Sequence, residues 1–358
     1  MDCTLSFLFH EIEKNITKKI PFAVYRKPND KVVTSYIQKN DEVYFLDDFE
    51  KSGFVFAPFN SLENSIIFPI DCCKIIKASS FDTLVVDNIK NTDVVFEDSE
   101  VLKKNHLKLV QKGIDFIKSG FAKKIVLSRK EIINVEAISI VTIFEKMLLN
   151  YQNAFVYCWF HPKIGLWLGA TPEKLLEISN KTIKTVSLAG TQLKLENFNH
   201  LETKWGEKEL EEQQIVTDFM VEQLKTHVDK ISLNGPISVT AGKMVHLSTT
   251  ISGEMIKPYF LKNIINCLHP TPAICGFPKD KSLKFIIENE GYHREFYSGY
   301  LGELNVSKKT ELFVNLRCMK VKENTVALYV GGGITSQSEP QKEWEETVFK
   351  TQTIKAIL

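Results

Sequence analysis

The sequence predicts an α+β protein built on large antiparallel sheets. Runs rich in β-branched and aromatic residues come in blocks, of which the clearest lie at residues 153–191 and 297–334. Helical patterns fall between these blocks and do not alternate with single strands, which disfavours a doubly wound parallel sheet. The 358 residues contain no internal repeat and no convincing linker, so we expect one domain over residues 1–358.

The first half of the chain divides into a weakly patterned region and a strongly patterned one. Residues 1–95 mix short apolar runs with turn signals, so we expect strands joined by loops there, and no residue of this region has a chemical signature. Residues 101–118 carry apolar residues at helical spacing and end at Ser119–Gly120, a typical helix C-cap. A β-rich run at 123–135 and a second helix at 138–149 follow.

The rest of the chain is mostly strands, interrupted by two long helices. One helix is predicted from Trp205 to about Val228, and the other from Pro340 to the C-terminus. The predicted strands lie at residues 153–162, 165–178, 183–191, 236–242, 249–255, 297–304, 312–321 and 325–334.

Charge and cysteine usage exclude several classes of protein. The 45 Lys and Arg residues nearly balance the 44 Asp and Glu residues, which argues against a broad basic surface for nucleic acid or an anionic membrane. No apolar run reaches the ~18–20 residues that span a bilayer, and the N-terminus lacks the basic start and cleavage site of a signal peptide. The seven cysteines include no CxxC pair, so we expect reduced thiols in a cytoplasmic protein.

Two predicted helices carry carboxylates on the face that should meet the core. At about 100° per residue, Glu209 and Glu212 share a face with apolar residues, and in the last helix Glu343 and Glu346 share a face with Lys350. Because unpaired buried carboxylates are costly, these four need a cationic partner. Mg²⁺ suits a site of oxygen ligands completed by water and an anionic substrate. The alternative is that the glutamates are exposed in the first helical turns, where the helix dipole favours them.

Two further features suggest an anionic ligand. The glycines at 331–333 follow the strand at 325–330, so their backbone N–H groups could approach a carboxylate, although such runs also form plain turns. Arg317 lies among apolar residues in a predicted strand, where it either pairs across strands at the surface or holds a carboxylate. Only four of the 45 basic residues are arginines, and lysine cannot replace a guanidinium that binds a carboxylate bidentately.

An ordered set of motifs resembles the chorismate-utilising enzymes, a family that includes isochorismate, salicylate, anthranilate and aminodeoxychorismate synthases. The motifs read KIVLSR, GATPE, LAGT, KELEEQ, HPTPAICGFP, YSGYLGEL, NLR, GGGI and EWEET, in family order. The resemblance covers about residues 115–355. It implies that residues 100–358 form a chorismate-binding core and residues 1–95 a variable half of the same catalytic domain. It also implies two large antiparallel sheets packed as a sandwich, with helices on the outside.

The resemblance gives the acidic faces a role. Glu212 and Glu346 match ligands of the Mg²⁺ that holds the ring carboxylate of chorismate, and Glu209 and Glu343 match residues that support the ion directly or through water. The expected substrate-binding positions are Arg317, Lys350, Gly332, Gly333, Ala189, Gly190, Thr191 and His246.

Two residues indicate the branch of the family. Lys124 is the first residue of the KIVLSR strand. It matches the lysine with which isochorismate and salicylate synthases activate a water molecule for attack on C2. To act as a base, this lysine must be neutral part of the time. Glu173 of GATPE matches the acid that protonates the departing C4 hydroxyl, a role that needs a raised pKa. Ala189 of LAGT stands where aminodeoxychorismate synthases carry a nucleophilic lysine, which favours water over ammonia.

The remaining family positions are expected to be supports. Arg129 and Arg294 lie within matched motifs and should stabilise the structure, while His246 and His269 should orient their neighbours instead of exchanging protons. The family usually has a histidine where Gln213 stands, and we expect Gln213 to point away from the face formed by Glu209 and Glu212.

The sequence therefore predicts a Mg²⁺-dependent isochorismate synthase, a cytoplasmic isomerase that acts on chorismate without an amidotransferase subunit. Salicylate synthase shares the first step and then eliminates pyruvate, but it is usually a longer chain. The sequence also leaves open an anthranilate or aminodeoxychorismate synthase component I and a non-catalytic chorismate-binding protein. The residues do not distinguish menaquinone from siderophore biosynthesis, nor do they fix the oligomeric state.

Overall fold

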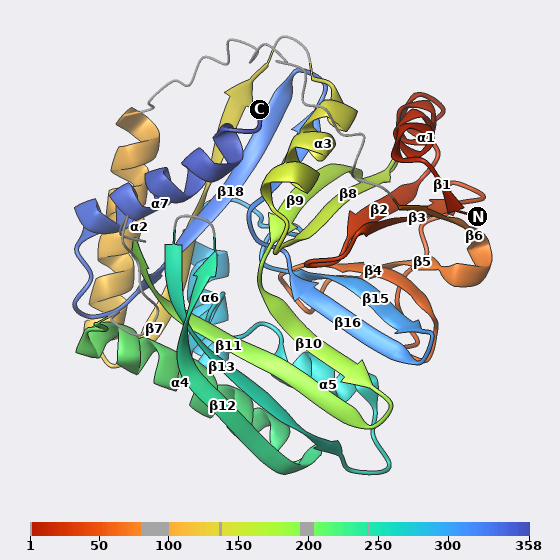
Figure 1. The fold of residues 1–358 in the computed structure, drawn as a ribbon. Coiled ribbons are helices and arrows are strands. Elements are labelled where there is room, and N and C mark those ends of the chain that lie inside the picture. The colour runs from red at the N-terminus through yellow and green to blue at the C-terminus, as the bar shows by residue number, and fades with distance from the viewer. Residues whose placement is uncertain (1, 80–99, 136–137, 194–203, 242–243) are drawn as a thin grey trace.

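The strands form two large sheets that pack against each other (Figure 1). The computed structural model describes residues 2–79, 100–135, 138–193, 204–241 and 244–358. The ten-stranded sheet has the order β1 (Asp2–Cys3), β6 (Cys73–Ser79), β3 (Val32–Gln38), β2 (Phe22–Arg26), β8 (Phe155–His161), β9 (Gly165–Thr171), β17 (Cys318–Lys322), β18 (Thr325–Ile334), β7 (Lys124–Asn134) and β14 (Gly276–Phe277). The eight-stranded sheet has the order β12 (Val228–Ala241), β13 (Met244–Met255), β11 (Thr182–Leu193), β10 (Lys174–Ser179), β16 (Lys309–Val314), β15 (Tyr300–Val306), β4 (Gly53–Ala57) and β5 (Ile66–Pro69).

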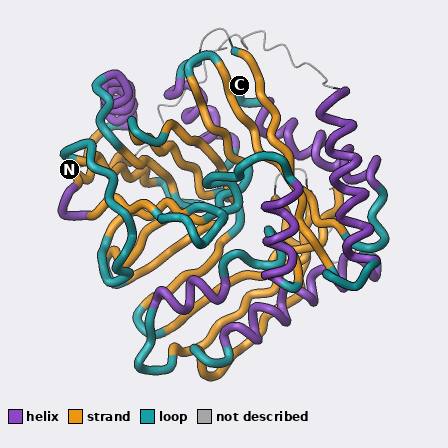
Figure 2. Tube along the Cα trace, turned by 180° about the vertical axis from the view of Figure 1, so that it is seen from behind, coloured by secondary structure: helices purple, strands orange, loops and turns teal. Residues whose placement is uncertain are grey.

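The pairings confirm the predicted α+β class. Neighbouring strands in the described residues are antiparallel, apart from the short parallel pair β1–β6. The helices lie outside the sheets, as the view from behind also shows (Figure 2). They are α1 (Leu5–Thr17), the short 3₁₀ helix η1 (Ile70–Cys72), α2 (Glu100–Lys118), α3 (Ile140–Asn150), α4 (Glu207–Leu224), α5 (Leu261–Leu268), α6 (Lys279–Asn289) and α7 (Pro340–Lys355). None of the helices in the described residues is long and apolar enough to cross a membrane.

Central strands such as β2 alternate their side chains between two buried layers. In β2, Phe22 and Val24 pack with α1 and α3 on the outer face, whereas Tyr25 faces an aromatic core between the sheets and stacks on Phe54 of β4 at a centroid distance of 5.0 Å. This alternation follows from the two-residue period of a strand. Helices α4 and α5 cover the eight-stranded sheet, and α2 and α6 pack near β7.

The prediction of strands and loops for residues 1–95 was wrong in one respect, because the chain begins with a helix. Thr4 caps α1 by accepting a hydrogen bond from the N–H of Phe7. The buried side chains Leu5, Leu8, Phe9 and Ile12 then recur at helical spacing. The first 79 residues contribute strands to both sheets, while residues 80–95 lie outside the described part of the chain.

Predicted helix boundaries were partly confirmed. Gly120 has φ +79 and caps α2 as expected, donating to the carbonyl of Ile117. The acidic helix α4 ends at Leu224, before the predicted end, and β12 already begins at Val228. Helices α5 and α6 were not predicted, whereas the C-terminal helix was. All seven cysteines are free thiols.

The predicted strand at 312–321 is in fact two strands in different sheets. β16 belongs to the eight-stranded sheet and β17 to the ten-stranded sheet, and residues 315–317 carry the chain between them. A second crossing, at 172–173, joins β9 to β10. The two crossings lie side by side, because the N–H of Val314 donates to the carbonyl of Glu173 at 2.9 Å and the N–H of Ala170 donates to the carbonyl of Arg317 at 3.2 Å. We call residues 172–173 and 315–317 the paired crossover.

Candidate active site

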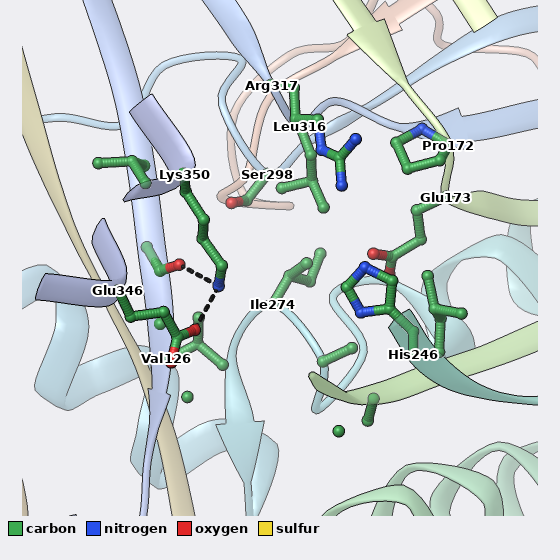
Figure 3. Close-up of a pocket in the computed structure, with 18 of the residues that line it drawn as sticks. Val126, Pro172, Glu173, His246, Ile274, Ser298, Leu316, Arg317, Glu346 and Lys350 are labelled. Carbon is green, nitrogen blue, oxygen red and sulfur yellow. Dashed lines mark hydrogen bonds and ion pairs between the residues drawn. The ribbon is translucent and has the colours of Figure 1, made fainter. Parts of the chain in front are cut away.

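A cavity opens beside the paired crossover, between β7, β18, α4 and α7 (Figure 3). Nearly all the residues predicted from the sequence line it, although they come from positions spread over more than 200 residues. Those lining residues are Lys124, Glu173, Ala189, Gly190, Glu209, Glu212, His246, Arg317, Gly332, Gly333, Glu346 and Lys350. Glu343 does not line the cavity, but its carboxylate lies against Gly332, which does. The side chain of Thr191 is outside what the structure describes.

Lys124 is buried, which an ordinary lysine at a strand end would not be. It is the first residue of β7 and its side chain is 1% exposed. Its Nζ lies 2.6 Å from Oε1 of Glu212 on α4. The proposed base and a proposed metal ligand are therefore in direct contact, and the ion pair fixes the position of both groups.

Glu173 lies in the paired crossover, on the side of the cavity that holds His246 and Arg317 (Figure 3). Burial raises the pKa of Glu173 to about 7, while the positive charges of Lys124, Arg317 and Lys350 oppose this rise. A carboxyl group with that pKa is protonated in a substantial fraction of molecules at neutral pH. It can therefore donate a proton, which is the role that the resemblance implies for Glu173.

The acidic face of α4 borders the cavity through residues near the N-terminus of the helix. Glu209 and Glu212 both line the cavity, whereas Glu207 and Glu211 are exposed. Gly206 precedes the helix, and a Cβ there would lie 2.6 Å from Oε2 of Glu209. The chain thus has no side chain at the position where the Glu209 carboxylate needs room.

The acidic face of α7 lies across the cavity from Glu173 (Figure 3). Glu343 is buried, with 4% exposure, so it is not a solvated glutamate of a first helical turn. Glu346 and Lys350 form an i,i+4 ion pair of 2.6 Å, and Lys350 Nζ also donates to the carbonyl of Gly331 at 3.1 Å. The ammonium group of Lys350 is therefore held at the cavity wall.

The glycine run lies within strand β18, which confirms the predicted strand at 325–334 and excludes a plain turn at the glycines. Gly332 and Gly333 pair with Leu127 and Val126 of β7. A Cβ at Gly333 would lie 2.9 Å from Cε of Lys124 and 3.0 Å from Oε1 of Glu212. These glycines are needed because charged side chains pack directly against the backbone, not because the strand turns.

Arg317 points into the cavity from the paired crossover (Figure 3). Its φ of +47 is left-handed, which costs a non-glycine residue roughly 1–3 kcal/mol. Burial lowers the pKa of Arg317, although a guanidinium stays protonated at neutral pH. A strained backbone that aims a half-buried guanidinium into a cavity favours carboxylate binding over a surface cross-strand pair.

The eight-stranded sheet supplies the opposite wall through Ala189, Gly190 and His246. Gly190 has φ +69, and a Cβ there would lie 3.1 Å from the carbonyl oxygen of Glu209. Burial, assisted by Arg317 and Lys350, lowers the pKa of His246 to about 3, so its imidazole is neutral. His269 is buried away from the cavity, where its Nε2 lies 3.0 Å from the carbonyl oxygen of Ser298.

Gln213 corrects a further expectation. Its side chain does not point away from the acidic face, because Gln213 lies one turn after Glu209 in α4. The side chain is 3% exposed and lies between α4 and the eight-stranded sheet. Its Nε2 lies within hydrogen-bond distance of Ser187 Oγ at 3.0 Å and of Thr249 Oγ1 at 3.1 Å. Gln213 therefore joins α4 to the eight-stranded sheet beneath the carboxylates.

Several lining residues were not predicted at all. The cavity also includes Val126, Pro172, Leu188, Ala273, Ile274, Tyr297, Ser298, Leu316, Tyr329, Val330, Phe349 and Ile354. Most are apolar or aromatic core types with nothing in the sequence to separate them from other core residues. Their apolar surface around a few charged groups is typical of a small-molecule site.

The donor set fits Mg²⁺. Within the described ranges no three His, Cys, Asp or Glu side chains converge closely enough to hold a metal alone, and Mg²⁺ normally takes one or two carboxylates and completes its shell with water and substrate oxygens. The acidic faces of α4 and α7 approach adjacent residues of β18, since Gly333 lies against Glu212 and Gly332 against Glu343 and Glu346. Oxygen ligands are thus available at one place.

Comparison with known proteins identifies the family. A model of the chorismate binding enzyme family matches residues 73–358. This chain belongs to the chorismate binding enzyme family. The predicted resemblance is therefore confirmed, and the cavity described above is the candidate active site of a family member.

Among the chorismate binding enzymes, this chain is similar to proteins named isochorismate synthase. It is 32% identical to EntC of Escherichia coli over 242 residues, which cover 64% of this chain and 61% of EntC. It is 27% identical to MenF of Bacillus subtilis over 291 residues, which cover 79% of this chain and 62% of MenF. The matched regions thus span about three fifths of these relatives.

The fold also matches a solved structure over nearly its full length. A structure described as a 2,3-dihydroxybenzoate-specific isochorismate synthase, DhbC from Bacillus anthracis, has a TM-score of 0.81 with 24% identity and covers 98% of this chain and 99% of that chain. This likeness confirms the predicted two-sheet fold.

Proposed function

We propose that this chain is an isochorismate synthase, which adds water at C2 of chorismate and expels the C4 hydroxyl. The observation that carries the proposal is the pairing of two groups in one cavity. A buried lysine, Lys124, and a carboxyl group with a pKa of about 7, Glu173, both line it. A base and an acid are what an exchange of one hydroxyl for another requires.

In this proposal Lys124 removes a proton from the attacking water as the new C–O bond forms at C2. The ring double bonds shift, the C–O bond at C4 breaks, and Glu173 donates its proton to the departing hydroxyl, which leaves as water. One water enters and one leaves, so the product is an isomer of the substrate. Neutral His246 next to Glu173 is proposed to orient the substrate and not to transfer protons.

Chorismate is a dianion, and the cavity offers cationic groups at separate points. We propose that Arg317 and Lys350 bind its carboxylates, supported by Gly332, Gly333 and the backbone at 189–191. Arg317 approaches from the paired crossover and Lys350 from α7, so two anionic groups would be held apart (Figure 3). Such two-point anchoring would fix the ring between acid and base.

We also propose that Glu212 and Glu346, supported by Glu209 and Glu343, hold Mg²⁺. When bound, the ion would neutralise the ring carboxylate of chorismate in a cavity that already contains several carboxylates. Because both sheets include strands from the first 79 residues, we propose that the whole chain forms one catalytic domain.

Product analysis tests the function directly. The chain is incubated with chorismate and Mg²⁺, and the products are separated. Isochorismate without pyruvate supports the proposal, whereas salicylate with stoichiometric pyruvate would assign a salicylate synthase. Turnover only when ammonia is added would refute water as the nucleophile. Tight chorismate binding with no product over hours would indicate a binding protein.

A pair of variants then tests the base. Lys124→Ala should lower kcat by about 10²–10⁴, the usual share of a general base, while chorismate still binds. Lys123→Ala is the matched control, because Lys123 is the preceding residue and is exposed. Hydration that survives in Lys124→Ala would remove this residue from its proposed role.

A further inference from the structure

Strand β7 has an incompletely paired edge beneath the cavity. Its neighbour β14 has only two residues, which pair with Lys124 and Ile125. The N–H of Val126 still finds a partner in the carbonyl of Cys275 at 2.8 Å. Beyond that point no strand of the described residues continues along this edge, yet a buried backbone needs partners for its polar groups.

A buried ion pair occupies the position of the missing strand. Arg294 Nη2 donates to the carbonyl of Val126 at 2.7 Å, and Glu290 Oε1 accepts from the N–H of Ser128 at 2.8 Å. The same carboxylate oxygen accepts from Ser128 Oγ at 2.8 Å, and Arg294 Nη1 donates to the carbonyl of Ile274 at 3.0 Å. Together the two side chains supply one donor and one acceptor to β7, as a neighbouring strand would.

The pair is rigid. Arg294 Nε donates to Glu290 Oε2 at 2.7 Å and its Nη2 contacts Oε1, so the contact is bidentate. The side chains are 3% and 1% exposed, and the guanidinium carbon lies 4.2 Å from the centroid of the Phe59 ring. Neither group can move without leaving a buried charge unpaired.

We propose that Glu290 and Arg294 are positioning residues for Lys124, an inference that rests on the proposed function. Lys124, Val126 and Ser128 share one face of β7 by the strand period, and Lys124 and Val126 line the cavity. Val126 also pairs with Gly333, whose backbone lies against Lys124 and Glu212. Holding Val126 and Ser128 therefore holds Lys124 in register with the glycines of β18.

The same pair positions a second wall of the cavity. Ile274, whose carbonyl Arg294 binds, lies at the cavity together with Val126 (Figure 3). The groups proposed to bind the carboxylates of chorismate, Arg317 and Lys350, come from other elements, the paired crossover and α7. Loss of the pair should therefore impair the chemical step more than the binding of chorismate.

The test compares three conservative variants. Arg294→Lys removes the fork, and Glu290→Gln keeps an acceptor for Ser128 while removing the charge. Arg26→Lys is the matched control, because Arg26 is also buried and also binds carbonyl groups, those of Leu148 and Tyr151, which do not line the cavity. For each variant we would measure the melting temperature, kcat, the Kd for chorismate and amide hydrogen exchange at residues 124–128.

We expect Arg294→Lys to lower kcat by about 10- to 100-fold, as a misplaced base would, with Kd changed by less than about threefold. Exchange at residues 124–128 should become faster, and Glu290→Gln should show the same effects to a smaller extent. Arg26→Lys should lower the melting temperature without these changes. Equal kcat losses in Arg294→Lys and Arg26→Lys, or unchanged exchange in Arg294→Lys, would overturn the proposal.

Failure of the proposed function would look different. If the wild-type chain made no isochorismate, the hydroxyl-exchange proposal would fall, but hydrogen exchange at residues 124–128 would still show whether the ion pair holds β7.

Discussion

Replacing Gly333 with alanine should damage the site without straining the backbone. The φ of Gly333 is not positive, so alanine can adopt the same conformation. The added Cβ would lie 2.9 Å from Cε of Lys124 and 3.0 Å from Oε1 of Glu212. Restoring ordinary van der Waals separation requires these groups to move by about half an ångström.

Moving Lys124 would disturb its ion pair, because its side chain is 1% exposed and its Nζ is already bound to Glu212. Overpacking of this kind costs about 1–3 kcal/mol of stability. A base displaced by a fraction of an ångström should lower kcat by about 10- to 100-fold. Isochorismate formation and thermal unfolding would be measured on the same preparation of Gly333→Ala.

The matched control is Gly332→Ala, one residue earlier in β18. There the new Cβ would lie 3.3 Å from Oε2 of Glu343 and 3.8 Å from Oε1 of Glu346, both at the ends of flexible side chains. Because the shorter of these contacts falls only about a tenth of an ångström inside ordinary van der Waals separation, we expect Gly332→Ala to lose less stability and less kcat than Gly333→Ala. If both variants retained activity, or lost it equally, the packing of Lys124 against Gly333 would not matter to the reaction.

Three further outcomes follow from the site and the core. Activity should fall as pH rises through about 7, because Glu173 must be protonated to act as an acid. If the residual activity of Glu173→Gln showed the same fall above pH 7, Glu173 would not be the acid. Glu346→Gln should raise the Mg²⁺ concentration that gives half-maximal rate by at least about tenfold. Glu345→Gln, at an exposed position of the same helix, should leave this concentration unchanged. Equal Mg²⁺ requirements in the two variants would remove Glu346 from the proposed ligands. Burial lowers the pKa of His106 and of His269 to about 4, so the unfolded chain binds more protons than the folded chain below about pH 6.5. The free energy of unfolding should therefore decrease as the pH falls from about 6.5 to 4, by about 3 kcal/mol for each histidine. Urea unfolding curves at several pH values measure this decrease. No decrease would mean that the two side chains are accessible to water.

The sequence predicted the local features of the site well, because local spacing carries them. Glu209 and Glu212, like Glu343 and Glu346, are three residues apart, so the helical period alone places each pair on one face. The ion pair between Glu346 and Lys350 has the same origin. These patterns needed no knowledge of the tertiary structure.

Contacts between distant segments were not predictable in this way. Lys124 and Glu212 are 88 residues apart, and nothing in either segment specifies that they meet. The division of residues 312–321 between two sheets was missed because a strand has the same two-residue period in either sheet. The first helix was missed, although its buried apolar residues recur at helical spacing, because strand patterns and turn signals dominate the rest of residues 1–95.

The paired crossover has a consequence for the stability of the whole chain. Arg317 and Glu173 join one sheet to the other, while Lys124 and His246 belong to different sheets. A ligand that contacts all four of these residues would bind to both sheets at once, so the two sheets could not separate without releasing the ligand. Saturation with substrate should then raise the free energy of unfolding of the entire chain, by about 2.7 kcal/mol at a ligand concentration 100 times Kd, and slow hydrogen exchange in strands of both sheets that lie far from the cavity.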